Sequence, residues 1–217
     1  MLEFQSQQMP NLSLTIGQIK ITPLFWALAL AFIFSSFSMW KKMIKESYLE
    51  KDIFSTQILI LLGGVIFEIL FKMSLGIIVF GAFLGILMVS AWRFKILAIN
   101  FWEGLDWLVL PIIYFFFFGG IGLFLNSWQW TAFGYSATSL LGLGLYLYLK
   151  KHYRRFFWYK SGKTGFLFWS ICFYFSAVLL VLDFLQTKKV YWSEVLWIVL
   201  LTSSAGAIYH RAELNKK

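Results

Sequence analysis

Cysteine and histidine are scarce in this sequence, and their scarcity excludes several kinds of chemistry. The single cysteine, Cys172, lies in an apolar stretch, so the chain can form neither an intrachain disulfide nor a CxxC redox motif. The two histidines, His152 and His210, lie in basic segments, without a second histidine at ligand spacing. We therefore expect no metal ion and no cofactor.

Charge is scarce as well. Charged residues make up 13% of the 217 residues, whereas 60% are hydrophobic and 21% are aromatic. A soluble domain of this size could not tolerate that composition on its surface, so the sequence predicts a multi-pass membrane protein. The formal net charge of +9 could indicate nucleic-acid binding. The basic residues, however, lie in short segments between apolar stretches, where they set membrane orientation, and we expect no nucleic-acid partner.

The apolar stretches predict an all-α membrane domain with seven transmembrane helices. The clearest stretch runs from Asp106 to Asn126 (DWLVLPIIYFFFFGGIGLFLN). At ~1.5 Å per residue it can cross the roughly 30 Å hydrocarbon layer once. A short turn, Lys72 to Ser74, is expected to separate the second span from the third. We expect one domain over residues 1–217, with spans near 21–40, 53–71, 75–92, 105–126, 135–149, 164–185 and 192–209.

The distribution of basic residues predicts the orientation. Fifteen of the 19 Lys and Arg residues fall in segments on the same side of the membrane as Lys41. Cytoplasmic loops carry the excess of Lys and Arg. We therefore expect the N-terminus outside and the C-terminus in the cytoplasm, which requires an odd number of spans. The four residues on the opposite side are Lys20, Lys72, Lys188 and Lys189.

Three glycines lie close together in the fourth span. Gly119, Gly120 and Gly122 follow a block of four phenylalanines and precede Asn126. A helix face without side chains lets another backbone or a lipid chain approach closely. Two interpretations stay open: packing of small residues between helices, and a lipid-binding surface formed by these glycines with Asn126 and Lys72.

Ionisable residues at membrane depth are costly and indicate functional sites. Glu68 and Lys72 are four residues apart, so they lie on one helix face and can pair. Asn126 and Asp183 are expected at the same outer level, which makes these four residues a polar cluster. Glu68, Lys72 and Asp183 are the candidates for catalysis, although Glu68 with Lys72 is equally well explained as an interfacial anchor.

The predicted cytoplasmic side carries two further features. Glu103 and Asp106 flank the start of the fourth span, where a helix N-terminus favours negative charge, so a capping role is expected. The segment from Lys150 to Lys163 mixes basic and aromatic residues. That mixture predicts an interfacial segment on anionic lipid headgroups.

The order of these features resembles the prolipoprotein diacylglyceryl transferase family, whose inner-membrane enzymes move diacylglycerol from phosphatidylglycerol to a lipoprotein cysteine. The resemblance implies a bacterial inner-membrane location and a link to lipoprotein biogenesis. It also implies three possible partners: a phosphatidylglycerol-like phospholipid, a lipoprotein precursor or another membrane protein. The similar stretches are IGQIKITPLFWALALAF (Ile16 to Phe32), LLGGVIFEIL (Leu61 to Leu70), IIVFGAFLG (Ile77 to Gly85) and the stretch from Asp106 to Asn126.

The resemblance fails at most of the positions that hold catalytic and other polar residues in the family. Asn126 and the glycines match, and Asp183 stands where the family has an acidic residue. The family's periplasmic head is reduced to Ser127 to Gly134. Apolar residues or glycine occupy the family's histidine, arginine and other polar positions: Leu24, Val65, Phe80, Gly120, Leu123, Trp128 and Leu179.

Three functions stay open. Splitting a phosphoglycerol head group needs cationic donors for the phosphate and a base for the incoming thiol. The sequence therefore favours a non-catalytic homologue, a pseudoenzyme that binds a phospholipid or a membrane partner. The alternatives are a divergent lipid transferase, with Lys72 on the phosphate and a carboxylate as base, and a small transporter or channel. All four arginines lie on the predicted cytoplasmic side: Arg93, Arg154, Arg155 and Arg211.

Overall fold

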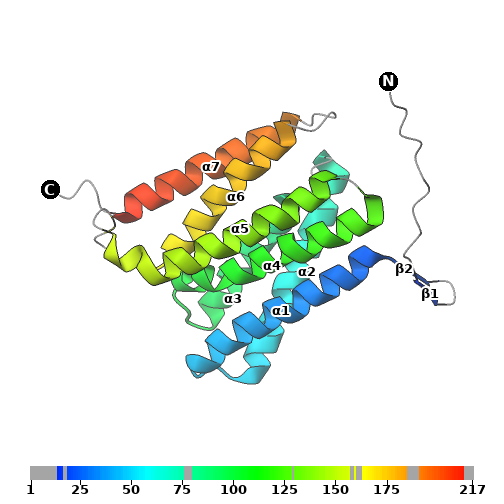
Figure 1. Cartoon of the computed structure of the whole chain (residues 1–217). Coiled ribbons are helices and arrows are strands. Elements are labelled where there is room, and N and C mark those ends of the chain that lie inside the picture. Colours follow the sequence, from blue (N-terminus) through cyan, green and yellow to red (C-terminus); the bar gives the residue numbers. More distant parts are fainter. Residues whose placement is uncertain are drawn as a thin grey trace.

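The computed structural model describes residues 14–16, 19–75, 80–128, 130–156, 159, 163–184 and 191–212. These ranges form seven α-helices after a two-stranded antiparallel hairpin, β1 (Leu14–Ile16) with β2 (Ile19–Ile21) (Figure 1). A short 3₁₀ helix, Tyr153–Arg155, follows the fifth α-helix. The α-helices are α1 (Pro23–Lys45), α2 (Glu50–Leu75), α3 (Phe80–Ile96), α4 (Phe101–Ser127), α5 (Trp130–His152), α6 (Phe166–Phe184) and α7 (Tyr191–Ala212).

Six of the described helices are long and apolar enough to cross a membrane: α1, α2, α4, α5, α6 and α7. The exception is α3, which has 17 residues, fewer than the ~20 of a typical span. Large apolar side chains such as Phe25, Ile33 and Phe37 are exposed on α1, as contact with lipid requires. The prediction of a helical, multi-pass membrane protein is therefore confirmed. The sequence analysis predicted an all-α domain and did not predict the hairpin of β1 and β2.

Every described helix except α6 extends beyond its predicted span at one end or both. The predicted turn from Lys72 to Ser74 is wrong, because α2 continues as a helix to Leu75. The segment contains no glycine or proline that would end a helix there. The fifth helix is longer than the predicted span 135–149 at both ends, since α5 runs from Trp130 to His152.

The centre of the bundle is α4, which contacts α1, α3, α5 and α6. In Figure 1, α1 lies along one side of α4 and α5 along the other, with α6 and α7 following α5. α2 and α3 form a closely packed pair. A Cβ built on Gly85 of α3 would lie 2.8 Å from the carbonyl carbon of Gly63 in α2, so glycine at both positions permits direct backbone contact.

Contacts between helix ends define one strongly basic end of the bundle. Lys42, near the end of α1, donates from Nζ to the backbone oxygen of Asp106, near the start of α4 (3.1 Å). The guanidinium of Arg211, in the last turn of α7, lies 4.3 Å from the centre of the Trp102 ring in the first turn of α4. The basic end carries Lys41, Lys42, Lys45, Arg93, Lys95, Lys150, Lys151, Arg154, Arg155 and Arg211.

Candidate functional site

The two carboxylates of the predicted outer cluster each join a pair of helices. Oε2 of Glu68 in α2 accepts a hydrogen bond from the backbone N–H of Ala82 in the first turn of α3 (3.1 Å). Oδ2 of Asp183 in α6 accepts one from the indole N–H of Trp197 in α7 (2.9 Å). The carboxylates therefore hold different helix pairs, α2 with α3 and α6 with α7.

The remaining members do not bring the cluster together within the described residues. Asn126 is exposed in the last turn of α4. Among the residues that the structure describes, neither Asn126 nor Asp183 makes a hydrogen bond or an ion pair with Glu68. Lys72 lies in α2, but its side chain is outside the described part of the chain, so its contact with phosphate stays a prediction.

Gly120 and Gly122 of α4 face neighbouring helices. A Cβ on Gly120 would lie 2.5 Å from Oγ of Ser136 in α5, and one on Gly122 would lie 2.6 Å from Cβ of Ala27 in α1. Side chains at these positions would push α4 away from both neighbours, so helix packing accounts for Gly120 and Gly122. Apart from its chain neighbours and the nearby backbone of α4, no described atom lies within 4 Å of a Cβ built on Gly119.

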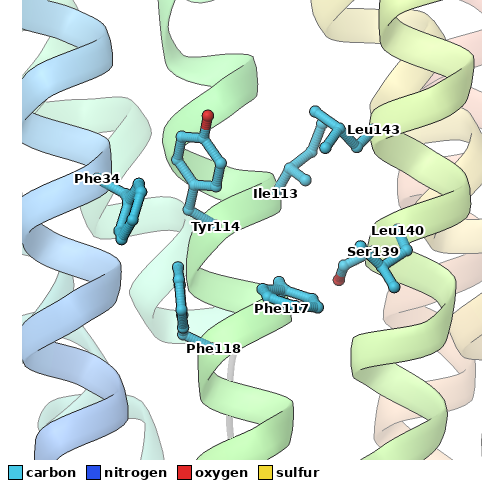
Figure 2. Close-up of a pocket in the computed structure, with 8 residues that line it drawn as sticks. All are labelled: Phe34, Ile113, Tyr114, Phe117, Phe118, Ser139, Leu140 and Leu143. Atoms are coloured by element: carbon cyan, nitrogen blue, oxygen red, sulfur yellow. The ribbon is translucent and has the colours of Figure 1, made fainter.

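An apolar groove lies across α4, between α1 and α5 (Figure 2). It encloses about 220 Å³ and is half-open on one side. This volume is below the ~300–1,000 Å³ of a typical small-molecule pocket. One residue of α1, four of α4 and three of α5 line it: Phe34, Ile113, Tyr114, Phe117, Phe118, Ser139, Leu140 and Leu143.

Aromatic packing shapes the groove and leaves it little polarity. The ring of Phe34 stacks on that of Phe118 at 5.2 Å between centroids and lies 5.8 Å from that of Tyr114. Ser139 directs its hydroxyl to the backbone oxygen of Tyr135 (2.7 Å), so this group is already hydrogen-bonded. The hydroxyl of Tyr114 is the other polar side-chain group of the lining. The groove therefore offers apolar contact and no acid–base pair.

At the basic end, Asp106 caps a helix other than its own. Its side chain is 8% exposed; Oδ2 accepts from Gly165 N–H (2.7 Å) and Oδ1 from Phe168 N–H (2.9 Å) at the start of α6. Glycine has no side-chain oxygen to cap α6, and Asp106 supplies it from α4. The expectation that Asp106 caps the fourth span is thus wrong, because Oδ1 of Asn100 caps α4 by accepting from Trp102 N–H (3.1 Å).

The sequence analysis did not predict that Asp106 caps α6. Its partners are the backbone N–H groups of Gly165 and Phe168, which lie about sixty residues after Asp106 in the sequence. One signal was available: a carboxylate that lies inside an apolar helix needs a specific partner. The phi angle of +90° at Gly165 is a second special feature of this junction, since only glycine adopts it without strain. Glu103, which was paired with Asp106 in the capping expectation, lies in the first turn of α4.

Two lysines and a tyrosine surround the start of α4. Lys42, near the end of α1, donates from Nζ to the backbone oxygen of Asp106. Nζ of Lys150 lies 5.8 Å from the centre of the Tyr146 ring. Tyr146 is buried, and its hydroxyl has no hydrogen-bond partner among the described residues. It follows Leu143 of the groove by about one turn of α5, so the groove lies next to the basic end.

Comparison with known proteins identifies no family. No protein-family model matches the chain, and no curated protein matches it. Within the described ranges, no group of three or more His, Cys, Asp and Glu side chains could hold a metal ion.

The Asp106 contacts lead to a stability prediction. Asp106→Asn replaces one acceptor oxygen with an NH₂ that cannot accept a hydrogen bond from α6. We expect unfolding of the detergent-purified protein to need about 1.5–3 kcal/mol less free energy, the usual contribution of a hydrogen bond to a charged group. Amide exchange measured by mass spectrometry should become faster around Gly165 and Phe168.

The matched control for this variant is Glu103→Gln, which removes a carboxylate from the same helix without touching α6. We expect its unfolding free energy and its exchange at the start of α6 to stay close to those of the unmodified protein. Equal stability and equal exchange for Asp106→Asn and Glu103→Gln would contradict the anchoring role of Asp106.

Proposed function

We propose that this chain is a non-catalytic phospholipid-binding protein of the bacterial inner membrane, similar to prolipoprotein diacylglyceryl transferases but without their chemistry. The observation that carries the proposal is the apolar groove between α1, α4 and α5. Phe34 and Leu140 at its rim are 46% and 54% exposed, so the groove is accessible from the side of the bundle. In a membrane that side faces the acyl chains.

The chemistry of the groove supports binding without reaction. Transfer of a diacylglyceryl group requires a base for the thiol and donors for the phosphate. The polar lining groups are the hydroxyls of Tyr114 and Ser139, and that of Ser139 is engaged with the backbone. Glu68 and Asp183, the carboxylates of the alternative transferase, accept hydrogen bonds from neighbouring helices, which favours a structural role for both.

The proposal includes the finer topology that the sequence predicts: seven spans, the N-terminus outside and the basic end in the cytoplasm. Its support is the concentration of Lys and Arg at one end of the bundle, as the positive-inside rule requires. In this topology α3 crosses the membrane beside α2, with which it packs through Gly63 and Gly85.

Cysteine labelling tests this topology. In a Cys172→Ala background, Lys41→Cys places a thiol at the basic end and Ser127→Cys places one at the opposite end of α4; both positions are exposed. An impermeant maleimide added to intact spheroplasts should modify Ser127→Cys and should reach Lys41→Cys only after lysis. The reverse pattern would contradict the orientation, and labelling of both variants from one side would contradict the membrane crossing.

Lipid retention tests the function. Native mass spectrometry of the protein released from mild detergent should show at least one bound phospholipid. Leu140→Trp places an indole at the rim of the groove and should reduce the lipid-bound fraction at least about fivefold, because the ring occupies space that the chain needs. Leu141→Trp is the matched control: residue 141 is 68% exposed, does not line the groove and should retain lipid.

Two results would overturn the proposal. The first is a protein that retains no phospholipid, or that retains it equally with Leu140→Trp and Leu141→Trp. The second is transfer of labelled diacylglycerol from phosphatidylglycerol to a lipoprotein-derived cysteine peptide by the purified protein. That activity, if abolished by Lys72→Ala, would establish the divergent transferase instead.

A further inference from the structure

The groove lies near the middle of the three helices that form it. Phe34 is the central residue of the 23-residue α1, and Tyr114 is the central residue of the 27-residue α4. On α5, which has 23 residues, the lining residues Leu140 and Leu143 lie on either side of the central Leu141. All three helices are long enough to cross a membrane, so the groove lies deep in the hydrocarbon layer, away from both membrane surfaces.

Charged side chains are far from the lining on each of these helices. The nearest one is seven positions away in every case: Lys41 on α1, Asp106 on α4 and Lys150 on α5. Seven residues of helix rise about 10 Å, two thirds of the ~15 Å from the surface of the hydrocarbon layer to its centre. Toward the opposite ends of the helices, nine or more residues separate the lining from Pro23, Ser127 and Trp130. Within α1, α4 and α5, no charge therefore lies at the level of the groove.

A phospholipid reaches this depth with its acyl chains and not with its headgroup. The headgroup stays at the membrane surface, and each chain extends through half of the ~30 Å hydrocarbon layer. The groove accordingly meets the distal part of a chain, whichever leaflet the lipid belongs to. Its walls are apolar at that level: the rings of Phe34 and Phe118 stack at 5.2 Å between centroids, and Figure 2 shows them across α4 from Leu140 and Leu143.

We infer that the groove selects a phospholipid by the length of its acyl chain and not by its headgroup. Van der Waals contact with the apolar walls provides the binding, and this contact grows with the length of chain inside the groove. A chain that reaches the bilayer centre fills the groove, whereas a chain of half that length ends before it. This inference rests on the proposed function and adds which part of the lipid the protein recognises.

Competition between two chain lengths tests the inference. The protein, purified in mild detergent, is mixed with equal amounts of dioctanoyl and dipalmitoyl phosphatidylcholine and analysed by native mass spectrometry. We expect the dipalmitoyl lipid to be enriched in the bound fraction at least about tenfold, because its chains span a bilayer leaflet and the dioctanoyl chains do not. Exchanging dipalmitoyl phosphatidylcholine for dipalmitoyl phosphatidylglycerol should leave the enrichment unchanged.

Matched variants distinguish the groove from a general preference of detergent micelles for long chains. Phe34→Ala removes a ring from the groove wall and should reduce the enrichment about fivefold, because the chain loses that contact. Phe37→Ala is its control: residue 37 lies on the same helix, is 60% exposed, does not line the groove and should keep the enrichment. Leu140→Ala, with Leu141→Ala as its control, forms a second pair on α5 and should behave in the same way.

The possible results separate this inference from the function it rests on. Three results would overturn the inference and leave the lipid-binding function standing: no preference for the longer chain, a preference that follows the headgroup, and equal enrichment in each variant and its control. Absence of any retained lipid would overturn both. Should Phe34→Ala fail to fold, Leu140→Ala and its control decide the outcome, since residue 140 is an exposed position at the rim of the groove.

Discussion

The buried carboxylate of Asp106 is the interaction on which the bundle depends. Removing a charge from water costs several kcal/mol, so such a group must have its partners in place. Asp106 accepts hydrogen bonds from Gly165 and Phe168 in α6, and its backbone oxygen accepts one from Lys42 in α1. One residue of α4 therefore fixes the register of two neighbouring helices. The register of α1 in turn sets where Phe34 meets α4, which forms one wall of the groove.

The polar and apolar parts of the molecule divide along the helix axes. Near the basic end lie charged side chains of α1, α4, α5 and α7, together with the backbone N–H groups at the start of α6. Farther along α4 the same helices present phenylalanine and leucine, and the glycines then allow close helix contact at Gly120 and Gly122. An amphiphile has the same order of parts, a charged head, a short polar linkage and an apolar chain. This order of surfaces is the one that the proposed binding of a phospholipid would require.

Composition was enough to predict the helical, membrane-embedded fold. A run of about 20 apolar residues is typical of a helix that crosses a membrane. The site was less predictable. Glu68 and Asp183 were grouped by their expected depth, but depth does not specify which helix a side chain faces, and each binds a different neighbour. The groove was missed because Phe34, Tyr114 and Leu140 resemble any lipid-facing residues in sequence. The role of Asp106 depends on backbone groups of a distant segment, which no local pattern reveals.

A cryo-electron microscopy map of the protein in nanodiscs rich in phosphatidylglycerol tests the central claim most directly. The account predicts continuous, chain-like density in the groove, between Phe34 and Leu140. A groove closed by direct packing of α1 on α5, or a groove without lipid density, would contradict it.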